Sequence, residues 1–280
     1  MRVTLNECEI YYEIHGKEDG ETIFFIHGGP GMSDSRGDVS AFSALGDQYK
    51  LVFMDMRGSG RSEEKGPYTH EQWIDDIDAL REYLEIEKLH ILGGSYGGYL
   101  TMEYALKYQK YLQSITLRDT AANDKYNYIS IDKALASNLP GIDEEMLTRL
   151  FGGEVRSNEE FKEMIRAILP LYTVEDTGNN EAKLNNIYWH YETHNFAFST
   201  NKKMYNISDR LSEIKVPTLI TVGIHDWVTP LECSEELAEK IPNNKFVKFE
   251  NSGHSPHQEE NEAYIKLLRV HLAANLISLK

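Results

Sequence analysis

The sequence predicts an α/β protein with a mainly parallel sheet and a helical segment inserted after the sixth strand. Three observations lead to this prediction. Short apolar runs alternate with segments of helical spacing through residues 1–118. Strand signals then give way to helical patterns over residues 119–213, and the alternation returns over residues 214–280. Strands that alternate with helices favour a mainly parallel sheet covered on both faces.

The opening residues supply the first strand signals. "MRVTLNECEIYYEIHG" alternates apolar and polar residues, which predicts an edge strand. Buried strands are predicted by the short apolar runs at 22–27, 50–55, 88–92 and 114–118. Between the second and third of these, Trp73, Ile77 and Leu80 recur at helical spacing. Thr69 precedes Gln72 by three residues, which predicts a capping box at the start of this helix.

The inserted segment carries helical patterns such as "DEEMLTRLF" and "NEEFKEMIRAILPLY". A buried strand is then predicted at 216–226 and a last strand at 244–250, with a helix between them and another at the end. We therefore divide the chain into a sheet core, residues 1–118 and 214–280, and a helical cap, residues 119–213.

Composition limits the possible functions. The chain has 280 residues, of which 41% are hydrophobic, so it can bury a substantial core. Its 45 acidic and 29 basic residues give a net charge of −16, which argues against nucleic acid as a partner. No signal peptide is predicted, because the opening residues have no basic region followed by a long apolar run. No membrane span is predicted, since no stretch approaches ~20 apolar residues. The two cysteines, Cys8 and Cys233, suggest neither a disulfide nor a zinc site. We expect a cytoplasmic protein without metal or cofactor.

The hexapeptide "GGSYGG" places Ser95 between two pairs of glycines, where a predicted strand passes into a predicted helix. One interpretation is structural, because glycines allow a crowded corner. The other is chemical: G-x-S-x-G is the nucleophile elbow, a strained turn that exposes a serine hydroxyl. The rest of the chain has to decide between them.

A serine nucleophile needs a base and a carboxylate that orients the base. In elbow-type hydrolases these follow along the chain as serine, acid, histidine. Asp226 comes directly after a predicted strand, and His254 follows the last strand, so both are expected at the carboxyl edge of the sheet. His225 and His257 are rival bases, and an aspartate at a strand end is often only a turn former. We predict the triad Ser95, Asp226 and His254.

The segment "HGGPG" follows the strand at 22–27. Acyl transfer builds negative charge on a carbonyl oxygen, and backbone amides commonly stabilise it. We predict that the amides of Gly29 and Tyr96 form this oxyanion hole. The segment "RGSGRSE" lacks the third glycine of a dinucleotide-binding loop, so Arg57 and Arg61 are expected to brace neighbouring loops.

Four motifs together, "HGGPG", "DMRGSGRS", "GGSYGG" and "SGH", resemble the proline iminopeptidase (prolyl aminopeptidase) family of α/β-hydrolases. The resemblance covers residues 1–118 and 214–280. It implies an α/β-hydrolase fold with an eight-stranded sheet and a helical cap. It also implies release of an N-terminal residue, often proline, from a small peptide or amino-acid derivative. The sequence departs from the family at Asp119, where a glycine is common, and at Trp227, where several relatives have glutamate.

An aminopeptidase recognises a free α-ammonium group, for which a carboxylate in a partly desolvated pocket is suited. The segment "HYETHNF" resembles the family's cap and nominates Glu192 as this carboxylate; a solvated glutamate on a helix face is the alternative. Trp189, Tyr191 and Trp227 are further substrate-binding candidates, although such aromatic residues also pack a cap against its core.

Three functions remain open. The first is a serine aminopeptidase that releases proline or another small apolar residue through an acyl-enzyme. A carboxylesterase, lactonase or amino-acid amidase would use the same triad. A non-catalytic binding protein of the same fold is disfavoured, because every member of the triad is in place. The sequence does not indicate an oligomeric state.

Overall fold

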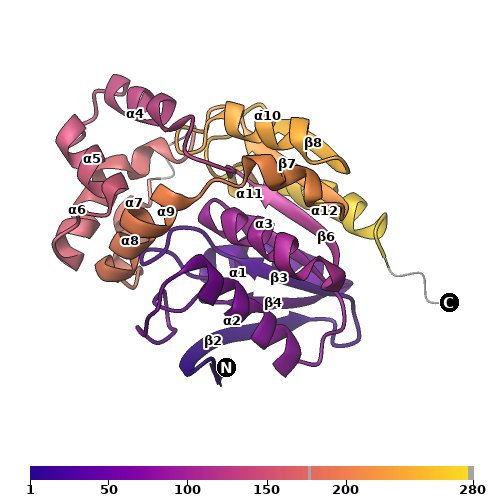
Figure 1. Ribbon diagram of the computed structural model, residues 1–280. Coiled ribbons are helices and arrows are strands. Elements are labelled where there is room, and N and C mark those ends of the chain that lie inside the picture. The colour runs from indigo at the N-terminus through magenta and orange to yellow at the C-terminus, as the bar shows by residue number, and fades with distance from the viewer. Residues whose placement is uncertain (176–177, 277–280) are drawn as a thin grey trace.

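An eight-stranded sheet forms the centre of the protein, in the order β1-β2-β4-β3-β5-β6-β7-β8 (Figure 1). The structure is a computed structural model that describes residues 1–175 and 178–276. β1 pairs antiparallel with β2, and β2 with β4, whereas all the other neighbours are parallel. The strands are β1 (Arg2–Leu5), β2 (Cys8–Gly16), β3 (Thr22–Ile26), β4 (Lys50–Met54), β5 (Leu89–Gly94), β6 (Leu112–Arg118), β7 (Thr218–Gly223) and β8 (Asn244–Phe249). The predicted mainly parallel sheet is confirmed.

The N-terminal segment forms a hairpin instead of the single edge strand expected from its alternation. Leu5 of β1 pairs with Cys8 of β2 across a two-residue turn. Both turn residues, Asn6 and Glu7, have positive φ angles, 45° and 62°. This is the backbone of a type I′ turn, whose twist matches that of the flanking strands.

Helices cover both faces of the sheet. Successive side chains of a strand point to opposite faces, so each face has its own apolar cluster. Phe24 and Ile26 of β3 join one apolar cluster, and Ile23 and Phe25 join another. The first cluster is covered by α2 (His70–Tyr83), α3 (Tyr96–Tyr108) and α10 (Leu231–Lys240). The second is covered by α1 (Arg36–Phe42) and α12 (Asn261–Ala273). Shorter helical turns are Ser43–Asp47, Gln109–Tyr111, Ser208–Glu213 and α11 (Pro256–Glu259).

Only one of the two hydrogen bonds of the predicted capping box is present at the start of α2. The hydroxyl of Thr69 accepts a hydrogen bond from the amide of Gln72, at 3.1 Å. The side chain of Gln72 does not return to Thr69 but donates to Asp76, at 3.0 Å. Asp76 also forms a buried ion pair with Arg57, so Gln72 helps to hold a loop brace.

Helices α4 to α9 lie between β6 and β7 along the chain and gather at one end of the sheet (Figure 1). They have their own apolar cluster, to which Phe161, Ile165 and Leu184 contribute, and Trp227 joins it from the β7 side. None of the helices within residues 1–175 and 178–276 has the length and apolar character needed to cross a bilayer. The helices are α4 (Asn127–Ala136), α5 (Glu144–Gly152), α6 (Asn158–Ile168), α7 (Asn180–Asn185), α8 (Tyr191–Phe196) and α9 (Lys202–Met204), with short turns at Leu169–Leu171 and Ala197–Asn201.

Candidate active site

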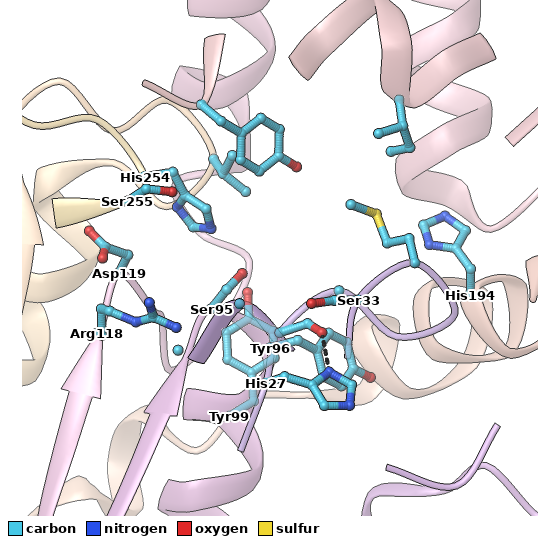
Figure 2. A pocket seen from close by; sticks show the side chains of 18 of the residues that line it. His27, Ser33, Ser95, Tyr96, Tyr99, Arg118, Asp119, His194, His254 and Ser255 are labelled. Atoms are coloured by element: carbon cyan, nitrogen blue, oxygen red, sulfur yellow. Dashed lines mark hydrogen bonds between the residues drawn. The ribbon is translucent and has the colours of Figure 1, made fainter. Parts of the chain in front are cut away.

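A pocket of about 210 Å³ lies between the carboxyl ends of the parallel strands and the helices α5, α6 and α9. Figure 2 shows side chains that line it. Its core side is lined by the loop after β3, by Ser95 and Tyr96, and by Arg118 and Asp119 at the end of β6. The loop after β8 contributes His254 and His257. The position agrees with the rule that open α/β sheets bind ligands at their carboxyl edge.

Ser95 connects β5 to α3 in a strained conformation, with φ 54° and ψ −122°. A non-glycine residue with positive φ persists only where its surroundings impose it. Here the amide of Ser95 donates to the carbonyl of Arg118 at 2.8 Å. Its carbonyl accepts from the Thr120 hydroxyl at 2.7 Å and from the Gly98 amide at 2.9 Å. These bonds fix the turn and leave the hydroxyl facing the pocket (Figure 2).

The four glycines around Ser95 each provide steric clearance. A Cβ at Gly93 would lie 2.1 Å from the Thr101 hydroxyl, and one at Gly98 would lie 2.4 Å from that of Thr120. A Cβ at Gly94 would lie 1.9 Å from the guanidinium of Arg118, and one at Gly97 would lie 2.1 Å from the carbonyl of Ile26. Side chains do not tolerate such distances. The crowded-corner and elbow interpretations of "GGSYGG" therefore describe the same turn.

Asp226 and His254 meet although 28 residues separate them in sequence. Nδ1 of His254 lies 2.8 Å from Oδ2 of Asp226, and the aspartate is fully buried. Asp226 also accepts hydrogen bonds from the amides of Val228 and Thr229, at 2.8 and 3.2 Å, and from the Thr229 hydroxyl, at 2.8 Å. The loop after β7 thus holds the buried carboxylate in place with three hydrogen bonds.

The ring of His254 faces the hydroxyl of Ser95 across the pocket (Figure 2). Burial lowers the pKa of His254, but the charge and the hydrogen bond of Asp226, with a contribution from Asp119, outweigh it, so the pKa lies above the ordinary value. The amide of His254 donates to the carbonyl of Tyr172 at 2.9 Å, and the two rings meet edge to face at 5.4 Å. Both contacts fix the orientation of the imidazole.

The two rival histidines occupy different environments. His225 is exposed and does not line the pocket. His257 lines the pocket, but its ring stacks on Phe42 at 5.6 Å, and within residues 1–175 and 178–276 it has no carboxylate partner. Burial, with a smaller effect of Arg118, lowers the pKa of His257 well below its ordinary value. Of the three, only His254 combines a carboxylate partner with a ring that faces Ser95.

The predicted oxyanion-hole residues Gly29 and Tyr96 lie at the pocket beside Ser95. Both residues line the pocket, and neither amide hydrogen-bonds to another residue of the described part of the chain. The loop carrying Gly29 packs on the elbow, since a Cβ at Gly28 would lie 2.9 Å from the Cβ of Ser95. The Ser59 hydroxyl accepts from the amide of Gly31 at 3.0 Å and holds the loop from its other side.

Arg57 and Arg61 brace loops, as expected from the sequence. Arg57 forms a bidentate, buried ion pair with Asp76, at 2.7 and 2.9 Å. Arg61 binds Asp55 at 2.7 Å, and Asp55 in turn accepts from the amide of Ser35 at 2.9 Å. The segment "RGSGRSE" thus supports the loop after β3.

Comparison with known proteins adds to this geometry. Residues 21–261 match the α/β hydrolase fold family. The chain is 36% identical to the proline iminopeptidase PfmaB of Pestalotiopsis fici, over 96% of this chain and 98% of that one. It is 30% identical to the proline iminopeptidase of Lactobacillus helveticus, over 93% of each. Among solved structures, an esterase from Exiguobacterium antarcticum superposes with a TM-score of 0.79 at 19% identity, covering 97% of this chain and 98% of that one.

The chain belongs to the proline iminopeptidase family of α/β-hydrolases.

The substrate-binding residues that were nominated in the sequence analysis lie away from the pocket. Glu192 is exposed, and its carboxylate accepts a 3.4 Å hydrogen bond from the Tyr191 hydroxyl. Trp189 packs edge to face on Phe161 at 5.2 Å, and Trp227 is buried in the apolar cluster of the cap helices. None of the four nominated residues lines the pocket. The structure thus brings the predicted triad together but does not bring these residues to it.

Other residues of the inserted helical segment line the pocket of this member of the proline iminopeptidase family. The apolar ones are Leu150, Phe151, Ile165, Ile168 and Phe198. They come from segments whose periodicity predicted only a packed helix face. Periodicity does not distinguish a side chain that packs on a neighbouring helix from one that borders a cavity. No signal in the sequence could have identified them.

Lys202 is a charged residue that lines the same side of the pocket, and no sequence pattern indicated it. Its ammonium lies 5.4 Å from the ring centre of Phe151 and 5.2 Å from that of Phe198. Burial lowers the pKa of Lys202 to about 8. Over the described residues, no carboxylate lies within ion-pair distance of it. The pocket therefore offers a cation that is held by aromatic rings and not by a counter-ion.

Proposed function

We propose that the protein is a serine aminopeptidase that releases proline or another small apolar residue from the N-terminus of short peptides. The observation that carries this proposal is the arrangement of Ser95, His254 and Asp226. A serine in an elbow turn faces an imidazole whose other nitrogen lies 2.8 Å from a buried aspartate. The resemblance to proline iminopeptidases over nearly the whole chain supports the choice of substrate class.

In the first half of the reaction, Ser95 attacks the carbonyl carbon of the N-terminal residue while Nε2 of His254 takes the hydroxyl proton. The carbonyl oxygen becomes an oxyanion and accepts hydrogen bonds from the amides of Gly29 and Tyr96. Asp226 holds Nδ1 of the imidazole and stabilises its charged form. His254 then gives its proton to the departing amine, the C–N bond breaks, and an acyl-enzyme on Ser95 remains.

In the second half, a water molecule takes the place of the amine. His254 accepts a proton from the water as its oxygen attacks the acyl carbon. The same two amides hold the second oxyanion. Collapse breaks the ester bond, and the proton on His254 returns to Ser95, so the free amino acid leaves and the enzyme is restored.

A second function, hydrolysis of an ester, lactone or amide without a free amine, is favoured by the charges in the pocket. The nominated anchor Glu192 lies outside it. Of the carboxylates that line it, Asp34 is paired with Arg36 at 2.6 Å, and Asp38 faces Arg118 at 3.4 Å. The third, Asp119, is buried, and burial and the charge of Asp226 raise its pKa to about 8, which disfavours the charged form that an ammonium group would need. A free ammonium group would have to compete with Arg36 and Arg118, whereas Lys202 has no carboxylate partner in the described part of the chain and can receive an anion.

The deciding experiment compares four substrates: proline p-nitroanilide, alanine p-nitroanilide, N-acetyl-proline p-nitroanilide and p-nitrophenyl acetate. Turnover of the two free-amine anilides, with the acetylated one refused, is expected for an aminopeptidase. Turnover of the acetate alone would replace the aminopeptidase proposal with the second function. Ser95→Ala serves as the control in both cases, because the variant has to be inactive on any substrate that uses the proposed nucleophile.

A further inference from the structure

Asp119 is a buried carboxylate that the mechanism above does not use. It follows β6 directly, is 1% exposed, and has a φ angle of 47°, in the left-handed region that favours glycine. Its amide donates to the carbonyl of Thr221 at 2.9 Å, and its Oδ1 accepts from the amide of Gly223 at 3.0 Å. The side chain is thus fixed between the ends of β6 and β7 in spite of an unfavourable backbone.

The position brings Asp119 to the pair of Asp226 and His254. One carboxylate oxygen from each aspartate and one ring nitrogen of His254 all lie within 4.8 Å of one another. Figure 2 shows Asp119 beside His254 at the end of its strand. Oδ2 of Asp119 is buried and has no hydrogen-bond partner in the described part of the chain. This spacing also suits a metal, but the hydrogen bonds of Asp226 already occupy both of its oxygens.

Two buried carboxylates this close do not both ionise at neutral pH, so the pair retains a proton. Asp226 is the more strongly hydrogen-bonded of the two, because three donors of its own loop and His254 bind it. Among the described residues, the side chain of Asp119 has one donor, the amide of Gly223. Burial, and after it the charge of Asp226, raise the pKa of Asp119 to about 8. The proton therefore resides on Asp119.

We propose that Asp119 is a second positioning carboxylate of the site, which takes over from Asp226 in stabilising the charged form of His254 when the charge of Asp226 is removed. This proposal rests on the proposed roles of Ser95, Asp226 and His254. The physical reason is that the charge of Asp226 helps to keep Asp119 protonated. Once that charge is gone, Asp119 ionises more readily and places a negative charge next to the imidazole.

The other charged and titratable groups near Asp119 do not remove this effect. Arg118, its neighbour on β6, faces Asp38 and favours ionisation of Asp119. Tyr264 on α12 has its pKa raised by burial and donates to or accepts from the Thr221 hydroxyl at 2.8 Å, so it stays neutral. His254, once protonated, favours the ionised form of Asp119 as well.

The test is a double-mutant cycle of Asp119→Asn and Asp226→Asn, with the rate of Ser95 labelling by a fluorophosphonate as the readout. This reagent needs no knowledge of the substrate. Asp119→Asn alone should slow labelling less than Asp226→Asn does, since the variant keeps the main carboxylate. Asp226→Asn should slow labelling by about 10²-fold, and the double variant by about 10⁴-fold, the loss typical when a lone orienting carboxylate becomes an amide. If Asp119→Asn has the same effect in both backgrounds, the proposal is overturned.

A second readout distinguishes positioning from a merely structural role. Histidine-ring NMR should show the pKa of His254 falling in two steps, from the wild type to Asp226→Asn and again to the double variant. An unchanged pKa in the second step contradicts the proposal. Asp119→Gly, which suits the positive φ, replaces Asp119→Asn if that variant is unstable. Labelling that persists in Ser95→Ala would defeat the proposed function instead, whereas wild-type labelling at Ser95 with an additive cycle would defeat only the role of Asp119.

Discussion

Nδ1 of His254 lies 2.8 Å from Oδ2 of Asp226, and both side chains are removed from solvent. Burial lowers the pKa of His254, but the aspartate outweighs it and raises this pKa above 6.5. A general base has to be neutral, so the labelling rate of Ser95 should be low in acid and rise with pH through a midpoint above 6.5. The measurement is the labelling rate across a pH series. Because the pair is buried, the midpoint should be the same in low and high salt; a midpoint below 6.5 contradicts this account.

The clearance at Gly97 leads to a prediction on stability. A Cβ there would lie 2.1 Å from the carbonyl of Ile26, which is strand backbone and cannot move aside cheaply. Gly97→Ala should therefore reduce the free energy of unfolding by about 1–3 kcal/mol, the usual range for overpacking. Gly37→Ala is the matched control, because Gly37 lies in α1 and, apart from its chain neighbours and the backbone of that helix, no atom of the described residues lies within 4 Å of the added Cβ. Thermal unfolding of both variants checks the prediction, and an equal effect of the two would refute it.

The backbone strain at Ser95 predicts that the residue needed for activity is not the most stable residue at this position. A non-glycine residue at φ 54° and ψ −122° costs about 1–3 kcal/mol, which glycine relieves. Ser95→Gly should thus be more stable than Ser95→Ala by about 1 kcal/mol, although both lack the hydroxyl and cannot be labelled. Denaturant unfolding of the two inactive variants measures the difference. If Ser95→Ala is as stable as Ser95→Gly, the turn is not strained.

The parts of the fold that depend on local pattern were predicted correctly. The apolar runs at 22–27 and 50–55 correspond to β3 and β4, because a strand buried on both faces has a nearly continuous apolar sequence. The hairpin at Asn6 and Glu7 was missed, since its turn has the required positive φ angles without a glycine. Strand alternation alone does not show where a chain reverses.

The cap side of the pocket could not be predicted, for a different reason. Asp226 and His254 could be placed because each follows a strand whose end lies at a known edge of the sheet. Glu192 was nominated from resemblance alone, and its exposure depends on how α8 lies on the core. Asp119 was noticed only as a departure from the family. Its approach to His254 comes from the neighbouring ends of β6 and β7, which no local pattern encodes.

Lys202 predicts a preference for negatively charged substrates. Its ammonium lies over the rings of Phe151 and Phe198 in the pocket wall and has no carboxylate partner among the described residues. A p-nitrophenyl hemiester with a free carboxylate should therefore be hydrolysed about tenfold more efficiently than a neutral p-nitrophenyl ester of equal length, as expected for one hydrogen bond to a charged group. The comparison is the ratio of the two kcat/KM values at neutral pH.

Lys202→Met should abolish this preference and leave the neutral ester almost unaffected, because methionine keeps the apolar stem and removes the charge. Since burial lowers the pKa of Lys202 to about 8, the preference of the wild type should also decline as the pH rises through that value. Lys203→Met is the matched control, because the neighbouring Lys203 is exposed and does not line the pocket. Equal ratios in Lys202→Met and the wild type would show that the ammonium does not contact the substrate. The charge of Lys202 would then no longer favour the second function over the aminopeptidase.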